Sequence, residues 1–147
     1  MDDIEKIKAE FLNHAFDETS FEIDGQKAAE FALTCGETNP RFTDPAHPDF
    51  QTIPTYSSSL MAGRNLPEGF PLFGGIALDG GKTVVPHKPI RPGVPLTGRS
   101  YVHDIYTKTG RSGRMIFVIS RMEFTDPHGE QVATADTRLV IREKISE

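Results

Sequence analysis

Glu37 is the residue of this chain best suited to acid–base chemistry, and it lies in a short polar stretch. The stretch reads Cys35-Gly36-Glu37-Thr38-Asn39-Pro40-Arg41-Phe42 and follows an amphipathic segment. A carboxylate accepts a proton from any group within hydrogen-bond reach, whereas the phenyl ring of Phe42 transfers none. Asn39 is suited to holding the turn through side-chain to backbone bonds. The residue types alone leave two readings of Glu37 open, a proton acceptor or a solvated loop carboxylate.

The other reactive side chains give weaker signals. Cys35 follows Ala28, Phe31 and Ala32 at helical spacing, so we expect it to be a small core residue and not a nucleophile. His47 with Asp44 or Asp49 is a second possible acid–base pair near the loop. No two histidines have the H-x-H or H-x-x-x-H spacing, so we expect no metal site; the five are His14, His47, His87, His103 and His128.

Composition limits the class of protein. With 147 residues, 37% of them hydrophobic and 25% charged, the chain is expected to form a single domain over residues 1–147. The net charge of -5 argues against a nucleic-acid partner. One cysteine permits no intrachain disulfide, and neither a signal peptide nor a membrane-length apolar run is visible. We therefore expect a cytoplasmic location, no membrane association and no cofactor.

The element pattern places helices first and strands second. Apolar periodicity predicts a helix over residues 1–16, a strand over 19–24, and a helix that Asp24 caps and Gly36 ends. A short helix is expected from Ser57 to Leu66, followed by a long flexible loop over 67–81. Four strands follow, at residues 82–90, 97–109, 114–125 and 130–143. This order indicates the α+β class.

Four short motifs, in order, carry a resemblance to a known family. They are the loop at 35–42, Ile53-Pro54-Thr55-Tyr56, Leu78-Asp79-Gly80-Gly81 and His87-Lys88-Pro89-Ile90-Arg91-Pro92-Gly93. Together they resemble the N-terminal, FAS1-like dehydratase branch of the MaoC-like (R)-specific enoyl-thioester hydratases and dehydratases. The family's catalytic loop reads Ser-Gly-Asp-x-Asn-Pro-x-His, so Glu37 stands at the Asp position and Phe42 at the His position.

The resemblance implies a hot-dog fold, in which a curved antiparallel sheet wraps a central helix, and a dimer of such folds. It makes Glu37 the one candidate catalytic residue and Phe42 a wall of the channel. The implied substrate-binding residues are Asn39, Phe42, Thr55, Tyr56, Ser57, Gly80, Arg91 and Arg114. The helix near Thr55 and Ser57 could stabilise an oxyanion, although either residue could equally be only a helix cap. Candidates for coenzyme A phosphates are Lys88, Arg91, Arg99, Lys108, Arg111 and Arg114, with solvated surface charges as the alternative.

Three functions remain open at this point. In the first, the chain is a subunit of an enoyl-CoA hydratase or 3-hydroxyacyl-thioester dehydratase, a lyase active only with a second MaoC-like chain that supplies the Asp and His. In the second, it is a homodimer that binds acyl thioesters, on CoA or a carrier protein, without hydratase activity. In the third, it is a homodimeric hydratase that uses Glu37. The sequence does not identify the acyl chain.

Overall fold

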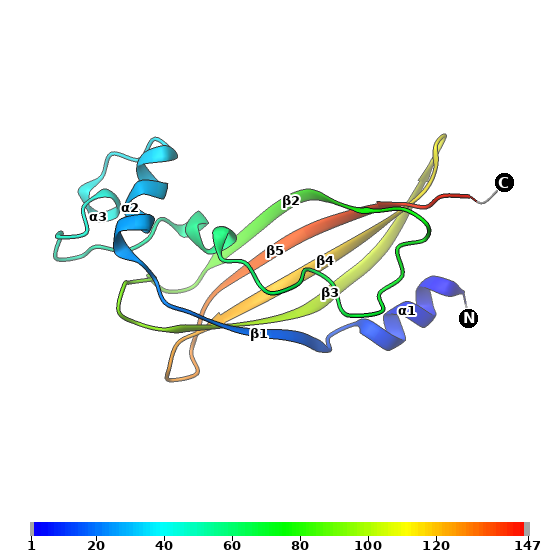
Figure 1. Ribbon diagram of the computed structural model, residues 1–147, viewed down its shortest axis with the longest axis horizontal. Coiled ribbons are helices and arrows are strands. Elements are labelled where there is room, and N and C mark those ends of the chain that lie inside the picture. Colours follow the sequence, from blue (N-terminus) through cyan, green and yellow to red (C-terminus); the bar gives the residue numbers. More distant parts are fainter. Residues whose placement is uncertain (1, 146–147) are drawn as a thin grey trace.

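The computed structural model describes residues 2–145 and has an α+β architecture, as the element order predicts. One five-stranded antiparallel sheet has the strand order β1-β3-β4-β5-β2. Its strands are β1 (Ala15–Phe21), β2 (Ala77–Pro86), β3 (Leu96–Gly110), β4 (Gly113–Thr125) and β5 (Gln131–Arg142). The helices are α1 (Asp3–Phe11), α2 (Gly25–Thr34), α3 (Pro40–Thr43) and the 3-10 helix η1 (Pro54–Ser59). Figure 1 shows α1 near one end of the long sheet and α2 with α3 beyond the other end.

The first helix is shorter than its periodicity predicts, because the sheet recruits the residues that follow it. Asp2 caps α1 by accepting the Glu5 N–H, and the helix ends at Phe11. Asn13 then takes a left-handed φ of 61°, and its N–H donates to the Val102 carbonyl at 2.8 Å. Residues 15–21 form β1, so the prediction of helix to residue 16 and strand at 19–24 was wrong in its boundaries.

The glycine-rich segment also departs from expectation, since β2 begins at Ala77 and not after residue 81. The register of β2 against β5 shifts between Asp79 and Lys82, and Gly81 takes a φ of 134°. This bulge lets the strand continue through Gly80 and Gly81. The expected helix at 57–66 is instead the short η1, followed by residues 60–76, which we call the strap.

One face of the sheet is covered by α1, η1 and the strap, and two apolar clusters lie on this covered face. The α1-end cluster joins Ile4 of α1 and Phe70 of the strap to buried strand residues such as Ile105 and Ile116. The α2-end cluster joins the small residues of α2 to the end of the sheet, through Ala28, Ala29, Ala32, Phe50, Ile53, Ile90 and Phe124. The opposite face, which we call the open face, carries polar and aromatic side chains, including the Arg121–Asp136 ion pair at 2.8 Å.

Among residues 2–145, no helix has the length and apolar character needed to span a membrane.

Candidate functional site

The loop that carries Glu37 begins with a well-defined helix end. Gly36 has a φ of 85°, its N–H donates to the Leu33 carbonyl, and the Glu37 N–H donates to the Ala32 carbonyl, each at 3.0 Å. These two bonds make a Schellman motif, which requires the left-handed conformation that glycine adopts most readily. At the other end of α2 Asp24 accepts the Lys27 N–H at 3.1 Å. Both boundaries that the sequence predicts for this helix are therefore confirmed to within two residues.

The carboxylate of Glu37 is turned back onto its own loop. One oxygen, Oε1, accepts the N–H of Thr38 at 3.0 Å and the N–H of Asn39 at 2.9 Å. These bonds hold that oxygen against the backbone, so this side chain acts in the structure as a brace for the turn.

Asn39 and Phe42 continue the turn into α3. Asn39 caps α3, and its side-chain oxygen accepts the Arg41 N–H at 3.0 Å, as the sequence predicts for a turn-holding residue. Phe42, at the family's histidine position, is half-buried against the α2-end cluster. An aromatic ring in this place supplies apolar surface and no proton.

The Thr55-Tyr56-Ser57 segment forms the first part of η1, next to α2. Tyr56 is buried, its ring meets that of Phe31 edge-on with centroids 5.3 Å apart, and burial raises the pKa of its hydroxyl. Ser57 is fully buried, and its hydroxyl donates to the Pro54 carbonyl at 3.3 Å. The N-cap residue of η1 is Ile53, without a side-chain cap bond. Neither Thr55 nor Ser57 is therefore the helix cap.

Asp49 ties this loop to the segment before β3 and was not predicted in that role. Its carboxylate contacts the Arg91 guanidinium at 2.7 Å and that of Arg41 at 3.0 Å. The Arg91 hydrogen bond is the main reason that the pKa of Asp49 is lowered. Arg91 also donates to the Phe50 carbonyl at 3.3 Å. No local sequence signal marks this triad, because Arg91 lies 42 residues after Asp49.

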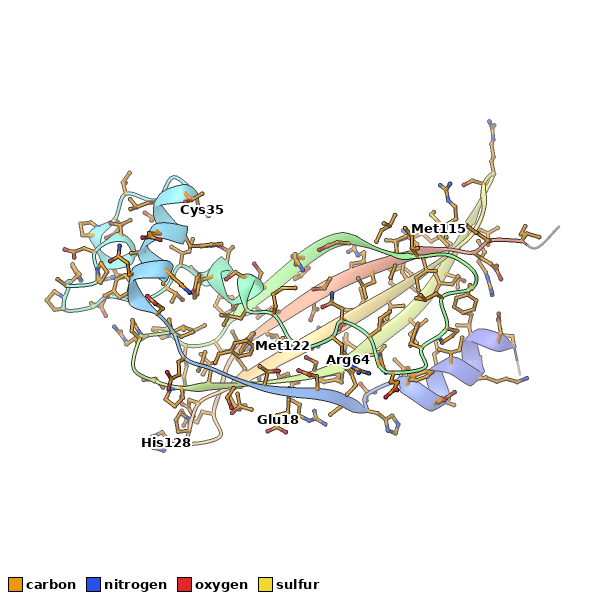
Figure 2. The ribbon with its side chains drawn as sticks, in the orientation of Figure 1. Glu18, Cys35, Arg64, Met115, Met122 and His128 are labelled. Atoms are coloured by element: carbon orange, nitrogen blue, oxygen red, sulfur yellow. The ribbon has the colours of Figure 1, made fainter. Side chains whose placement is uncertain are left out.

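The possible His47 pair has a different arrangement from the one suggested. His47 accepts the Asp49 N–H on Nδ1 at 3.0 Å, while the Asp49 carboxylate is bound by the two arginines. Asp44 accepts the Ala46 N–H at 2.9 Å. Cys35 is exposed and not a core residue, because it is the C-cap of α2; Figure 2 shows it at the end of that helix.

Two candidate substrate residues lie away from the loop. Gly80 lies within β2, where an added Cβ would come within 2.6 Å of Val140 Cγ2. Arg114 is the second residue of β4 and precedes Met115, which Figure 2 shows at the end of the sheet nearer α1. Its guanidinium donates to Asp3 at 2.7 and 3.0 Å and to Glu143 at 2.8 and 3.0 Å, so it joins α1 to the end of β5.

The remaining phosphate candidates are dispersed over the molecule. Lys88 pairs with Glu130, Arg99 lies over the Tyr101 ring, and Lys108 lies over the Phe117 ring. Arg111 is in the exposed turn between β3 and β4. Among the phosphate candidates, Arg91 is the one bonded to the segment between α3 and η1, through Asp49 and Phe50.

Solved structures share this architecture. The fold is similar to the MaoC-like dehydratase of Rhodospirillum rubrum, with a TM-score of 0.62 at 17% identity over 92% of this chain and 94% of that one. It is also similar to a chain of the ChsH1–ChsH2 complex of Mycobacterium tuberculosis, with a TM-score of 0.64 at 16% identity over 98% and 91%. A chain of the HadBC 3R-hydroxyacyl-ACP dehydratase complex of the same organism gives 0.60 at 21% identity over 88% and 99%. The sheet and its helices thus have the hot-dog fold of MaoC-like proteins. The helix α2 lies beyond one end of the sheet and not inside its curve, which differs from the expected central helix.

Sequence comparison defines the family. The model described as "FAS1-like, dehydratase domain region" matches residues 10–135, so the chain belongs to this family of MaoC-like hydratases and dehydratases. A UPF0336 protein of Streptomyces coelicolor is 31% identical over 134 residues, which cover 83% of this chain and 85% of that protein. A UPF0336 protein of a Parafrankia species is 26% identical over 147 residues, covering 92% and 95%.

Proposed function

We propose that this chain is the non-catalytic subunit of an enoyl-thioester hydratase or 3-hydroxyacyl-thioester dehydratase. A second MaoC-like chain supplies the Asp and His, while this chain shapes the binding channel for an acyl-CoA or acyl-carrier thioester. The proposal rests on the state of the two family positions: Phe42 occupies the histidine position, and the Glu37 carboxylate is bound to its own loop.

The hydration reaction shows why the residues at these two positions matter. Hydration of a 2-enoyl thioester needs a base for the attacking water and an acid for the α-carbon, both within hydrogen-bond reach. Phe42 supplies neither. The Oε1 atom of Glu37 is occupied by two N–H groups, and small misplacements of a catalytic group cost about 10²-fold in rate. These facts favour a shared site over unaided catalysis by Glu37.

The edge of the sheet offers a surface for the second chain. β2 lies at one edge of the sheet, and Leu78 and Val85 on it are exposed by 57% and 46%. A long edge strand presents unpaired backbone donors and acceptors to a partner. The similar ChsH1–ChsH2 and HadBC structures are complexes of different chains, which supports a second MaoC-like chain as that partner.

The group of Arg41, Asp49 and Arg91 could bind the phosphates of the thioester carrier. Arg41 and Arg91 share the single carboxylate of Asp49, so the group keeps a net positive charge beside the loop. Arginine forks match phosphate oxygens in geometry. In this proposal the carrier end of the substrate lies next to Phe42, and its acyl end extends towards η1.

The test is a hydration assay with crotonyl-CoA and 2-octenoyl-CoA. The chain is assayed alone and after co-expression with a MaoC-like chain that carries the Asp and His. We expect turnover only in the pair, its loss when the partner's Asp or His is replaced, and its retention with Glu37→Gln in this chain.

Two outcomes would contradict the proposal. Turnover by this chain alone that Glu37→Gln abolishes would establish the homodimeric hydratase. Calorimetric binding of octanoyl-CoA without turnover in any pairing would establish the thioester-binding homodimer.

A further inference from the structure

A band of polar side chains crosses the covered face of the sheet. The strand registers pair Asp17 with Ser100, Ser120 with Thr137, and Thr137 with Lys82. Ser100 and Ser120 lie on the neighbouring strands β3 and β4, and the Lys82 ammonium donates to the Thr137 hydroxyl at 3.0 Å. Ser100 pairs with Met122 and Ser120 with Val102, so the band crosses from one edge strand to the other on a diagonal.

The band interrupts a face that is otherwise apolar. Its neighbours along the strands include Val102, Val118 and Phe124, which are fully buried. Ser100 and Ser120 are themselves only 2% and 8% exposed. A buried hydroxyl costs free energy unless a hydrogen bond replaces its lost water, and aliphatic side chains here would extend the core. Ser100 and Ser120 line a cavity, so their hydroxyls can bond a small polar group that enters it.

A small cavity lies over these serines. It has a volume of about 30 Å³, and its floor includes Ser100, Ser120 and Met122. Its roof comes from Ser57 of η1 and from Arg64 of the strap; Figure 2 shows Arg64 and Met122 over the middle part of the sheet. This volume holds about one or two water-sized groups, so it suits an oxygen substituent and not an alkyl chain.

The cavity adjoins the proposed substrate channel. Ser57, which lines it, directly follows the Thr55-Tyr56 pair in η1. Three charged side chains also line the cavity, Arg64, Lys82 and Asp136, and each has an ion-pair partner. Lys82 pairs with Asp79 at 3.2 Å, and Asp136 pairs with Arg121 at 2.8 Å.

We infer that the acyl group of the substrate carries a hydroxyl or keto oxygen away from the thioester, and that this oxygen binds in the serine cavity. The inference rests on the proposed function, since it places an acyl thioester in this channel. The Ser100 and Ser120 hydroxyls each donate to or accept from the substrate oxygen, which displaces water. The site would thereby select an oxygenated acyl group over its apolar counterpart.

The experiment compares decanoyl-CoA with hydroxydecanoyl-CoAs whose hydroxyl lies at each carbon from C5 to C9. Binding is measured by calorimetry with the full chain, alone and in complex with its catalytic partner. We expect at least one positional isomer to bind about 5–10-fold more tightly than decanoyl-CoA, the value of one good hydrogen bond. Ser120→Ala should reduce this preference to less than about twofold and leave the affinity for decanoyl-CoA unchanged.

Three measurements separate this role from a structural one. Ser100→Ala should repeat the loss of preference, and Ser112→Ala, in the exposed β3–β4 turn, should not alter it. The urea midpoint of Ser120→Ala should equal or exceed that of the parent chain, because a hydroxyl kept for a ligand contributes no stability.

Two negative outcomes distinguish this inference from the proposed function. Equal affinity for decanoyl-CoA and every isomer would overturn the inference and leave the proposed function standing, with only water in the cavity. No binding of any of these thioesters would contradict the proposed function, and the inference with it.

Discussion

Replacing Gly80 by alanine is expected to destabilise the fold without affecting thioester binding. The added Cβ would lie 2.6 Å from Val140 Cγ2 and 3.3 Å from the Arg138 carbonyl oxygen. Both distances are shorter than ordinary van der Waals contacts, which begin near 3.4 Å. Either β2 or Val140 must move by most of an ångström. Overpacking of this kind costs about 1–3 kcal/mol, and since β2 is an edge strand that can shift, we expect about 1–2 kcal/mol.

Urea denaturation followed by circular dichroism measures this cost. With an m-value of about 2 kcal/mol/M, the midpoint should fall by roughly 0.5–1 M at unchanged m. Gly110→Ala is the matched control, because no atom lies within 4 Å of the Cβ that it would add. Combining Gly80→Ala with Val140→Ala should recover part of the loss, giving a coupling of about 0.5 kcal/mol or more.

The result also decides between two roles for Gly80. The family resemblance implies that it binds substrate, whereas the structure accounts for it by the close approach of β5. A Gly80→Ala chain with parental stability and reduced affinity for octanoyl-CoA would refute the packing argument and support the substrate role.

Three further predictions concern other parts of the molecule. Burial, and after it the 2.6 Å hydrogen bond to Glu123, raises the pKa of Tyr101. The stability that this neutral hydroxyl contributes is therefore present below the unfolded pKa of about 10 and is lost as pH rises further. Tyr101→Phe should flatten this loss in urea titrations from pH 8 to 11. The lowered pKa of Asp49 gives the opposite pH dependence: its stabilisation is present above the unfolded pKa of about 3.9 and is lost on acidification. Asp49→Asn should reduce that acid sensitivity and speed hydrogen exchange of the Gln51 N–H, which bonds the Arg41 carbonyl. Unchanged exchange would show that Arg41, Asp49 and Arg91 do not hold the loop. Leu78→Lys on β2 should weaken association with the second MaoC-like chain in sedimentation experiments while leaving the urea midpoint of the isolated chain within about 0.5 kcal/mol of the parent value; undiminished association would mean that the chains meet elsewhere.

Local chemistry in the sequence was enough to predict several elements. Asp24 and Gly36 bound α2 because a cap and a left-handed glycine act within one helical turn. The turns at 110–113 and 126–129 separate strands that begin and end within one or two residues of prediction. Where prediction failed, contacts distant in sequence decided the outcome. The Val102 carbonyl bonds the Asn13 N–H at the turn that leads into β1, and pairing with β5 makes an expected loop part of β2.

The sequence by itself determined the family and the absence of a histidine at position 42, because both depend only on which residues occur and in what order. Only the tertiary structure decided how these residues are used. It bound the Glu37 carboxylate to its own turn, assigned Arg114 to the junction of α1 and β5, and brought Arg41, Asp49 and Arg91 together. It also put Ser100 and Ser120 on neighbouring strands, where they line the same cavity. The physical reason is that hydrogen bonds and ion pairs depend on distances of about 3 Å, and strand register and loop closure set those distances between segments far apart in the chain.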